Sequence, residues 1–224
     1  MVFPLFNYEN IKESAIDFRY LLNRKYNQKA ALELVGNRWN LNRDERHILY
    51  RAIFSDEEIN ERNQTEVKPE QLQGKTVIID TYNILITLES ILKGLIVIKA
   101  NDGYLRDISK VSGKYKQSEY TIQAIQMVLK KLKVLSPKEV NFFLDKNISK
   151  SGQLAALIKE ELENINIKGD ARTVQCTDKA VIESVKVVIS NDRIILEKTR
   201  AHLNLISLIL YDFKKSEEKI LKFA

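Results

Sequence analysis

Four aspartates are the residues of this chain whose type and position are best suited to chemistry. Each lies where an apolar segment ends or where a helix is expected to begin: Asp80, Asp145, Asp178 and Asp192. Ligands of open parallel sheets bind beyond the carboxyl ends of the strands, so acids from adjacent strands meet at one edge. Unpaired like charges in one pocket repel one another, and a divalent cation relieves that repulsion. We therefore expect the four carboxylates to share one metal site.

Mg²⁺ or Mn²⁺ is the ion that these ligands favour, because carboxylate oxygens are hard donors and no histidine or cysteine joins them. The chain has one cysteine, Cys176, and two histidines, which argues against a disulfide framework, structural zinc or a histidine-dependent triad. One or two divalent ions can activate water and stabilise the charge that develops during phosphodiester cleavage. Asn83, three residues after Asp80, would orient that carboxylate. The alternative is that these acids only cap helices and turns in a protein-interaction scaffold.

The elements that must position these acids alternate between strands and helices. Asp80 follows the apolar run Val77–Ile79 in the segment KTVIIDTYNIL, a pattern typical of a strand buried on both faces of a parallel sheet. Similar runs predict further strands over 140–144, 172–176 and 186–189. Amphipathic segments between these runs predict helices. The fold class is therefore α/β with a mostly parallel central sheet.

The first 70 residues predict a small all-α domain. Asn27 can cap a helix that ends at Gly36, a residue suited to the left-handed position after a helix. Asn42 and Ser55 each begin a capping box, which predicts two more helices. Residues 61–74 are polar, contain a proline and show no sustained period, so they indicate a linker. The expected domains are 1–70 and 71–224.

The distribution of basic residues suggests a polyanionic partner. The formal net charge is +6, and residues 19 to 51 hold eight basic residues against three acidic ones. Two predicted helices separated by a turn that contains a glycine suggest a helix-turn-helix motif. In that motif Arg38, Arg43 and Arg46 would contact a nucleic acid. The turn is longer than in that motif, so a solvated arginine face is the alternative. We expect Trp39 to fill the small core rather than to stack on a base.

Two further segments could contact phosphate groups. A strand over 95–99 and a hairpin turn in which Asp102 serves the turn lead into an exposed basic flap. The flap residues expected to bind nucleic acid are Arg106, Lys114 and Lys116. After Asp145, the segment KNISKSG places Ser149 and Ser151 before a helix, where Ser151 would cap the helix and free amides could bind phosphate oxygens. Residues 214–222 are expected to form a charged tail.

Four ordered segments carry a family resemblance: IIDTYN after the first strand, then FFLD, TDKAVIE and VVISNDRII. Together they resemble the acidic motifs of the PIN-like nucleases, particularly the NYN branch, over about residues 75–196. The resemblance implies a PIN-like three-layer fold in which Asp80 with Asn83, Asp145, Asp178 and Asp192 are the catalytic residues and the aspartates bind metal. The whole chain, with its N-terminal helices, also resembles an uncharacterised archaeal family of the domain-of-unknown-function 434 type, which implies no activity.

The motifs and the resemblance lead us to expect a Mg²⁺- or Mn²⁺-dependent nuclease, an endoribonuclease that hydrolyses phosphodiester bonds, with RNA as its partner. Lys179 follows Asp178 where many relatives carry a second acid, and this motivates the alternative of a non-catalytic RNA-binding or ribosome-associated module on the same fold. No apolar run approaches membrane-spanning length and no secretion signal opens the sequence, so we expect a cytoplasmic protein without a membrane partner. The oligomeric state stays open, a homodimer included.

Overall fold

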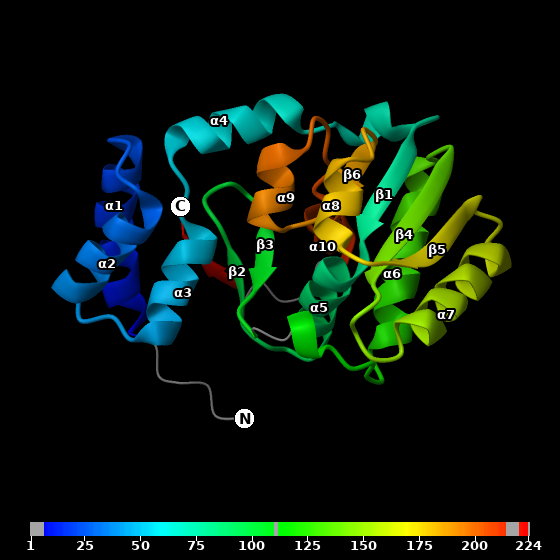
Figure 1. Ribbon diagram of the computed structural model, residues 1–224, viewed down its shortest axis with the longest axis horizontal. Coiled ribbons are helices and arrows are strands. Elements are labelled where there is room, and N and C mark those ends of the chain that lie inside the picture. Colours follow the sequence, from blue (N-terminus) through cyan, green and yellow to red (C-terminus); the bar gives the residue numbers. More distant parts are fainter. Residues whose placement is uncertain (1–6, 110–111, 214–219, 224) are drawn as a thin grey trace.

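A four-stranded parallel sheet forms the centre of the α/β part of the protein (Figure 1). The computed structural model describes residues 7–109, 112–213 and 220–223. The strands run in the order β5-β4-β1-β6. Their bounds are Thr76–Asp80 for β1, Glu139–Asp145 for β4, Gly169–Val174 for β5 and Val187–Ile189 for β6. The prediction of a mostly parallel central sheet is therefore confirmed, and β1, β4 and β6 lie where the apolar runs placed them, whereas β5 begins three residues earlier than the predicted strand over 172–176 and ends at Val174.

Helices cover both faces of this sheet because alternate strand residues point to opposite sides. Val77 and Ile79 of β1 pack into the larger core, whereas Ile78 joins a smaller one. The larger core is formed with α5 (Thr81–Leu92), α6 (Thr121–Leu135), α7 (Ser151–Asn164) and α10 (Leu205–Phe213). The smaller core is formed with α8 (Thr177–Ile182) and α9 (Arg193–Lys198). Within the described ranges, no helix combines the length and apolar character needed to cross a membrane.

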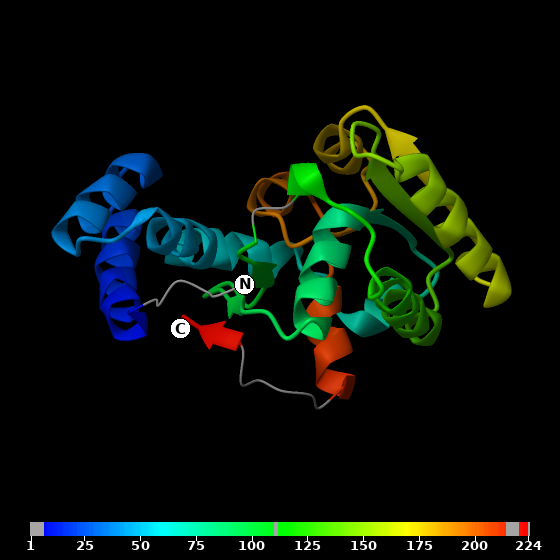
Figure 2. The ribbon, with the colours of Figure 1, turned by 90° about the horizontal axis from the view of Figure 1, so that it is seen from below.

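Four helices precede the sheet as a helical unit: the first three pack together at one side of it, and the fourth extends from them to α9 (Figure 1 and Figure 2). They are α1 (Tyr8–Asn23), α2 (Gln28–Arg38), α3 (Arg43–Ala52) and α4 (Asp56–Thr65), followed by the 3₁₀ turn η1 (Pro69–Leu72). The capping boxes predicted at Asn42 and Ser55 are both present. The last turn of α4 extends into the segment that we expected to be a linker.

The predicted end of α2 at Gly36 is wrong. The helix continues to Arg38, and the left-handed residue that follows it is Asn40, with φ 49°. Gly36 has a packing role instead, since a Cβ there would overlap the guanidinium of Arg46. Arg46 crosses Gly36 and donates to the carbonyl oxygen of Leu41 at 2.9 Å, which ties α3 to the end of α2.

A second, three-stranded sheet joins the helical unit to the rest of the protein. Its order is β3-β2-β7, with β2 at Val97–Lys99, β3 at Leu105–Asp107 and β7 at Ile220–Lys222. The strand expected near residue 97 thus exists, but it lies outside the central sheet. Residues 220–222, expected in a charged tail, form a strand parallel to β2, while 214–219 lie outside the described residues. Ile98, Ala100 and Phe223 share one apolar core with α1, α2 and α3.

A candidate active site at the carboxyl edge of the sheet

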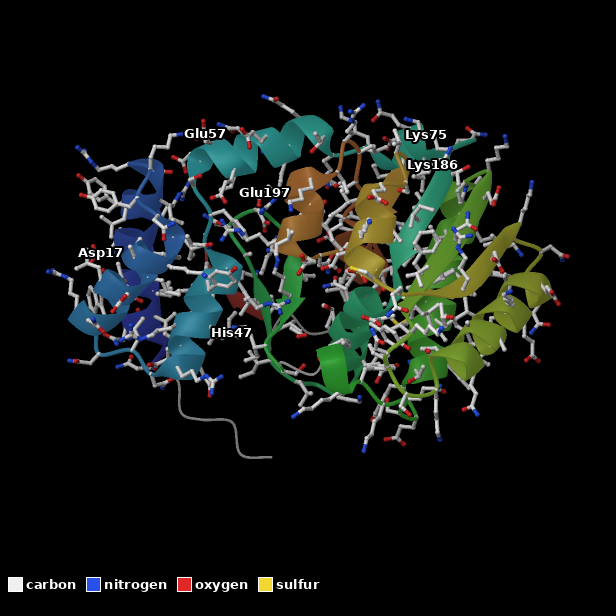
Figure 3. All side chains as sticks on the ribbon, viewed as in Figure 1. Asp17, His47, Glu57, Lys75, Lys186 and Glu197 are labelled. Carbon is white, nitrogen blue, oxygen red and sulfur yellow. The ribbon has the colours of Figure 1, made fainter. Side chains whose placement is uncertain are left out.

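The four predicted aspartates line a single cavity of about 300 Å³. The cavity lies at the carboxyl ends of β1 and β4. Lys75 and Lys186, which precede β1 and β6, lie together at the opposite edge of the sheet (Figure 3). All five residues expected to be catalytic are brought together here. The polar side chains that line the cavity are those of Asp80, Asn83, Asp145, Asp178 and Asp192, together with Arg51, Tyr82, Asp107 and Thr177.

Asp80, the last residue of β1, is the most deeply buried of the four aspartates. It is 7% exposed, and its Oδ2 accepts a hydrogen bond from Ser190 Oγ at 2.8 Å. Its side chain makes no capping hydrogen bond to α5. Asp80 nevertheless occupies the N-cap position of α5, and the nearby backbone N–H of Asn83 opposes the rise in its pKa, so Asp80 combines a position at the start of the helix with a place in the cavity.

Asn83 positions a loop rather than the carboxylate of Asp80. Its Oδ1 accepts a hydrogen bond from the backbone N–H of Asn191 at 2.7 Å. The Asn191 side chain donates in turn to the carbonyl oxygen of Leu105 at 2.7 Å. Asn83 therefore fixes the segment that carries Ser190 and Asp192, and it acts on the acidic cavity through that segment.

Asp192 and Asp145 combine a local structural role with a place in the cavity. Asp192 caps α9, because its Oδ1 accepts from the backbone N–H of Ile194 at 2.8 Å and from that of Ile195 at 3.3 Å. The Oδ1 of Asp145 accepts from the backbone N–H of Asn147 at 2.8 Å. One carboxylate oxygen of Asp192 thus has the alternative role of a helix cap, and one of Asp145 has the alternative role of a turn residue. The same carboxylates also line the cavity.

The electrostatics couple the four carboxylates. Burial raises the pKa of Asp80 to about 7, and repulsion from Asp192 and Asp178 adds to the rise while the Ser190 hydrogen bond opposes it. Burial also raises the pKa of Asp178, with repulsion from Asp192 and Asp145 next in size. Asp145, Asp178 and Asp192 therefore each raise the pKa of a neighbouring aspartate, as expected where negative charges lie close together.

The donor set fits a hard divalent cation held partly through water. Within the described ranges, no three His, Cys, Asp or Glu side chains are placed to enclose an ion directly. Mg²⁺ commonly keeps several waters and takes only one or two protein carboxylates, the remainder coming from the substrate. The raised pKa of Asp80 is the kind of electrostatic penalty that a bound cation would remove.

Several lining residues were not among the predicted site residues. Arg51 of α3 reaches the cavity from the helical unit, and Asp107 reaches it from the end of β3. Tyr82 and Thr177 each stand beside a predicted residue in the sequence and also line the cavity. Only the neighbours of the acidic motifs could have been found from spacing, because Arg51 and Asp107 reach the cavity through tertiary contacts.

Arg106 is the clearest correction among the residues expected to bind nucleic acid. It is 1% exposed rather than on an exposed flap. Its guanidinium donates to the carboxylate of Asp102 and, through Nε at 2.8 Å, to the carbonyl oxygen of Asn191. Asp102, which also pairs with Arg62, is consequently the centre of a buried ionic cluster as well as a turn residue. Arg106 supports the segment that carries Asp192 and does not face solvent.

The other residues expected to bind nucleic acid divide by exposure. Those that are exposed are Arg38, Arg43, Lys114, Lys116 and Ser149. Arg46 is engaged with the end of α2, as described above. Ser151 is buried and is the first residue of α7, so its predicted capping role is wrong. Trp39 packs against the helical core and donates through Nε1 to Asp17 at 2.8 Å, which confirms its expected place. Asp17 lies on α1 (Figure 3).

The protein is thus a mixed α/β protein with a helical N-terminal unit and an acidic cavity at the carboxyl edge of a parallel sheet. The chain belongs to the family described as domain of unknown function DUF5616, whose profile matches residues 69–208. Residues 10–64 match the profile described as protein of unknown function DUF434, which confirms the resemblance to an uncharacterised family.

An uncharacterised protein of the archaeon Methanocaldococcus jannaschii is 35% identical over 208 residues. The alignment covers 92% of this chain and 99% of that protein, so the helical and α/β parts occur together in both. No solved structure matches the chain.

Proposed function

We propose that the protein is a metal-dependent nuclease, an endoribonuclease that hydrolyses phosphodiester bonds in the acidic cavity. One observation carries the proposal: four strand-end or helix-start aspartates line one cavity, where burial first, and repulsion from neighbouring aspartates next, raise the pKa values of Asp80 and Asp178. A site that concentrates negative charge in this way is suited to a cation and to a polyanionic substrate bound through it. The PIN-like, NYN-type assignment belongs to this proposal and is supported by the order of the acids.

The residues have distinct roles in the proposed reaction. Asp80, Asp145, Asp178 and Asp192 would hold Mg²⁺ or Mn²⁺, which when bound would supply Lewis-acid activation of water and of the phosphodiester. Ser190 fixes the rotamer of Asp80 through its 2.8 Å hydrogen bond. RNA would be held by the exposed residues Arg38, Arg43, Lys114, Lys116 and Ser149, which supply backbone contacts without base selectivity.

The test is cleavage of a labelled single-stranded RNA and a labelled hairpin with Mn²⁺, Mg²⁺ or excess chelator. We expect cleavage only with metal, and a loss of at least about a hundredfold in Asp80→Asn and Asp178→Asn, because removing charge from such a site weakens transition-state stabilisation. Asp170→Asn is the matched control, since Asp170 lies on β5, pairs with Lys159 and does not line the cavity. Cleavage that survives Asp80→Asn at the wild-type rate would exclude this cavity as the active site.

A second candidate function is a non-catalytic RNA-binding module. It is favoured by the lack of a ready-made cluster of three metal ligands in the described part of the chain. Binding of RNA that weakens steeply with salt, without any turnover in Mn²⁺ or Mg²⁺, would identify the protein as such a module.

A further inference from the structure

A cation from the helical unit extends into the acidic cavity without a partner. Arg51, near the end of α3, lines the cavity, and its guanidinium makes no hydrogen bond or ion pair with another residue in the described ranges. Its Nε is sealed from solvent. A buried polar group without a partner is rare in native proteins, and a buried charge without one is costly. Contacts within the protein therefore do not account for the placement of the Arg51 side chain, which suggests that the side chain binds a ligand.

Two hydroxyl groups around the same cavity share this property. Tyr82 and Thr177 are 5% and 7% exposed, and neither Tyr82 Oη nor Thr177 Oγ1 has a hydrogen-bond partner. The Tyr82 ring packs against Tyr115 with 5.0 Å between ring centroids, which holds it in place. Three unsatisfied polar side chains thus surround one cavity and come from α3, α5 and α8.

The chemistry of these groups defines the ligand. A guanidinium can only donate hydrogen bonds, and both hydroxyls can donate, so the complementary ligand offers several acceptor oxygens. Burial, together with repulsion from Arg106, lowers the pKa of Arg51 and outweighs the attraction of Asp107 and Asp192, neither of which forms an ion pair with it. The cavity holds about ten water volumes, enough for a phosphate group and the ions beside it. Arginine is well suited to phosphate because its planar fork binds two oxygens at once.

We infer that Arg51, with Tyr82 and Thr177, binds a phosphate group of the substrate opposite the four aspartates, so that the helical unit completes the active site. The identification of the substrate as RNA rests on the proposed function. The inference that a phosphate group binds here depends only on the three hydrogen-bond donors without partners: Arg51, Tyr82 and Thr177. The DUF434 and DUF5616 segments therefore contribute to one site, which explains why they occur in one chain here and in the archaeal relative.

The test uses the full chain and adenosine 5′-monophosphate, titrated calorimetrically in the presence of Mn²⁺. We expect the affinity to fall at least tenfold in Arg51→Met, to recover in part in Arg51→Lys, and to fall severalfold in Thr177→Val, because each substitution removes a donor to the phosphate. Arg200→Met is the matched control: it removes the same charge from an exposed arginine and should leave the affinity unchanged. Affinity for Mn²⁺ alone should stay the same or rise in Arg51→Met, since a repelling cation is lost.

Thermal unfolding separates binding from a merely structural role. In the absence of ligand, Arg51→Met should unfold at the same temperature as the wild type or higher, because the substitution removes an unpaired, partly buried charge whose Nε is sealed from solvent. Wild-type protein that binds no monophosphate, or Arg51→Met that binds it with wild-type affinity, would overturn the inference. Absence of RNA cleavage together with Arg51-dependent monophosphate binding would instead overturn only the nuclease proposal.

Discussion

Asp80→Asn should stabilise the metal-free protein at neutral and alkaline pH. The pKa of Asp80 rises on folding from 3.8 to about 7, so the folded state binds this proton more tightly than the unfolded state does. A pKa unit corresponds to about 1.4 kcal/mol, so ionised Asp80 lowers the free energy of unfolding by up to about 4 kcal/mol above pH 7. This loss of stability accumulates as the pH rises from about 4 to about 7 and is constant above that range.

The assay is urea unfolding in the presence of chelator at several pH values between 4 and 8. The free energy of unfolding of Asp80→Asn minus that of the wild type should be near zero at pH 4 and should grow to between about 2 and 4 kcal/mol at pH 8. The amide oxygen can still accept the hydrogen bond from Ser190 Oγ, so the substitution preserves that contact. With Mn²⁺ present, the wild type should become more stable than Asp80→Asn, because Mn²⁺ binds more tightly to the folded protein that has all four carboxylates.

Asp170→Asn is the control for this experiment. The hydrogen bond from Lys159 holds the pKa of Asp170 below its ordinary value, so its removal should give no gain in stability that grows with pH. A difference between Asp80→Asn and the wild type that is independent of pH would refute the reasoning. So would an Asp80→Asn protein that is less stable than the wild type at pH 8 without metal.

Three further predictions concern positions outside the cavity. Asp102→Asn should lower the free energy of unfolding by about 3–5 kcal/mol in denaturant titrations, because it leaves two buried arginines without their partner. Burial lowers the pKa of His202 to about 4, so stability should rise by up to about 3 kcal/mol between pH 4 and 6.5, and His202→Gln should remove this dependence. Gly36→Ala gains about 1 kcal/mol of helix propensity but must displace the flexible Arg46 guanidinium, so it should change the free energy of unfolding little in the wild type and raise it by about 1 kcal/mol in an Arg46→Met background; equal effects in both backgrounds would contradict the packing role.

The acidic cavity could be predicted from the sequence because its geometry follows from local patterns. Asp80 and Asp145 each end an apolar run, and parallel pairing of β1 with β4 then brings them to one edge. Asp178 and Asp192 reach the same edge because each lies at the start of a helix, α8 or α9, that follows a strand of the sheet. The capping boxes were equally predictable, since each depends on residues only three positions apart.

Features that depend on distant partners were not predictable from local patterns. Arg106 follows a turn and precedes a basic segment, which suggested an exposed flap. Its burial depends on Asn191, 85 residues away, and on Asp102, whose own burial no local pattern reveals. Likewise, residues 220–222 follow the charged run KKSEEK, which suggested a tail, and their strand conformation depends on pairing with the distant strand β2.

Strand β7 also determines when the protein can finish folding. Phe223 is part of the apolar core of α1, α2 and α3, and Tyr8 Oη donates to the carbonyl oxygen of Lys222, 214 positions away, at 2.9 Å. Contacts between such distant residues form late, because a long loop must close first. During synthesis, the core of helices α1 to α3 is therefore complete only after residues 220–223 have been made and have packed against it. Because α3 carries Arg51, the cavity reaches its full composition only after that step.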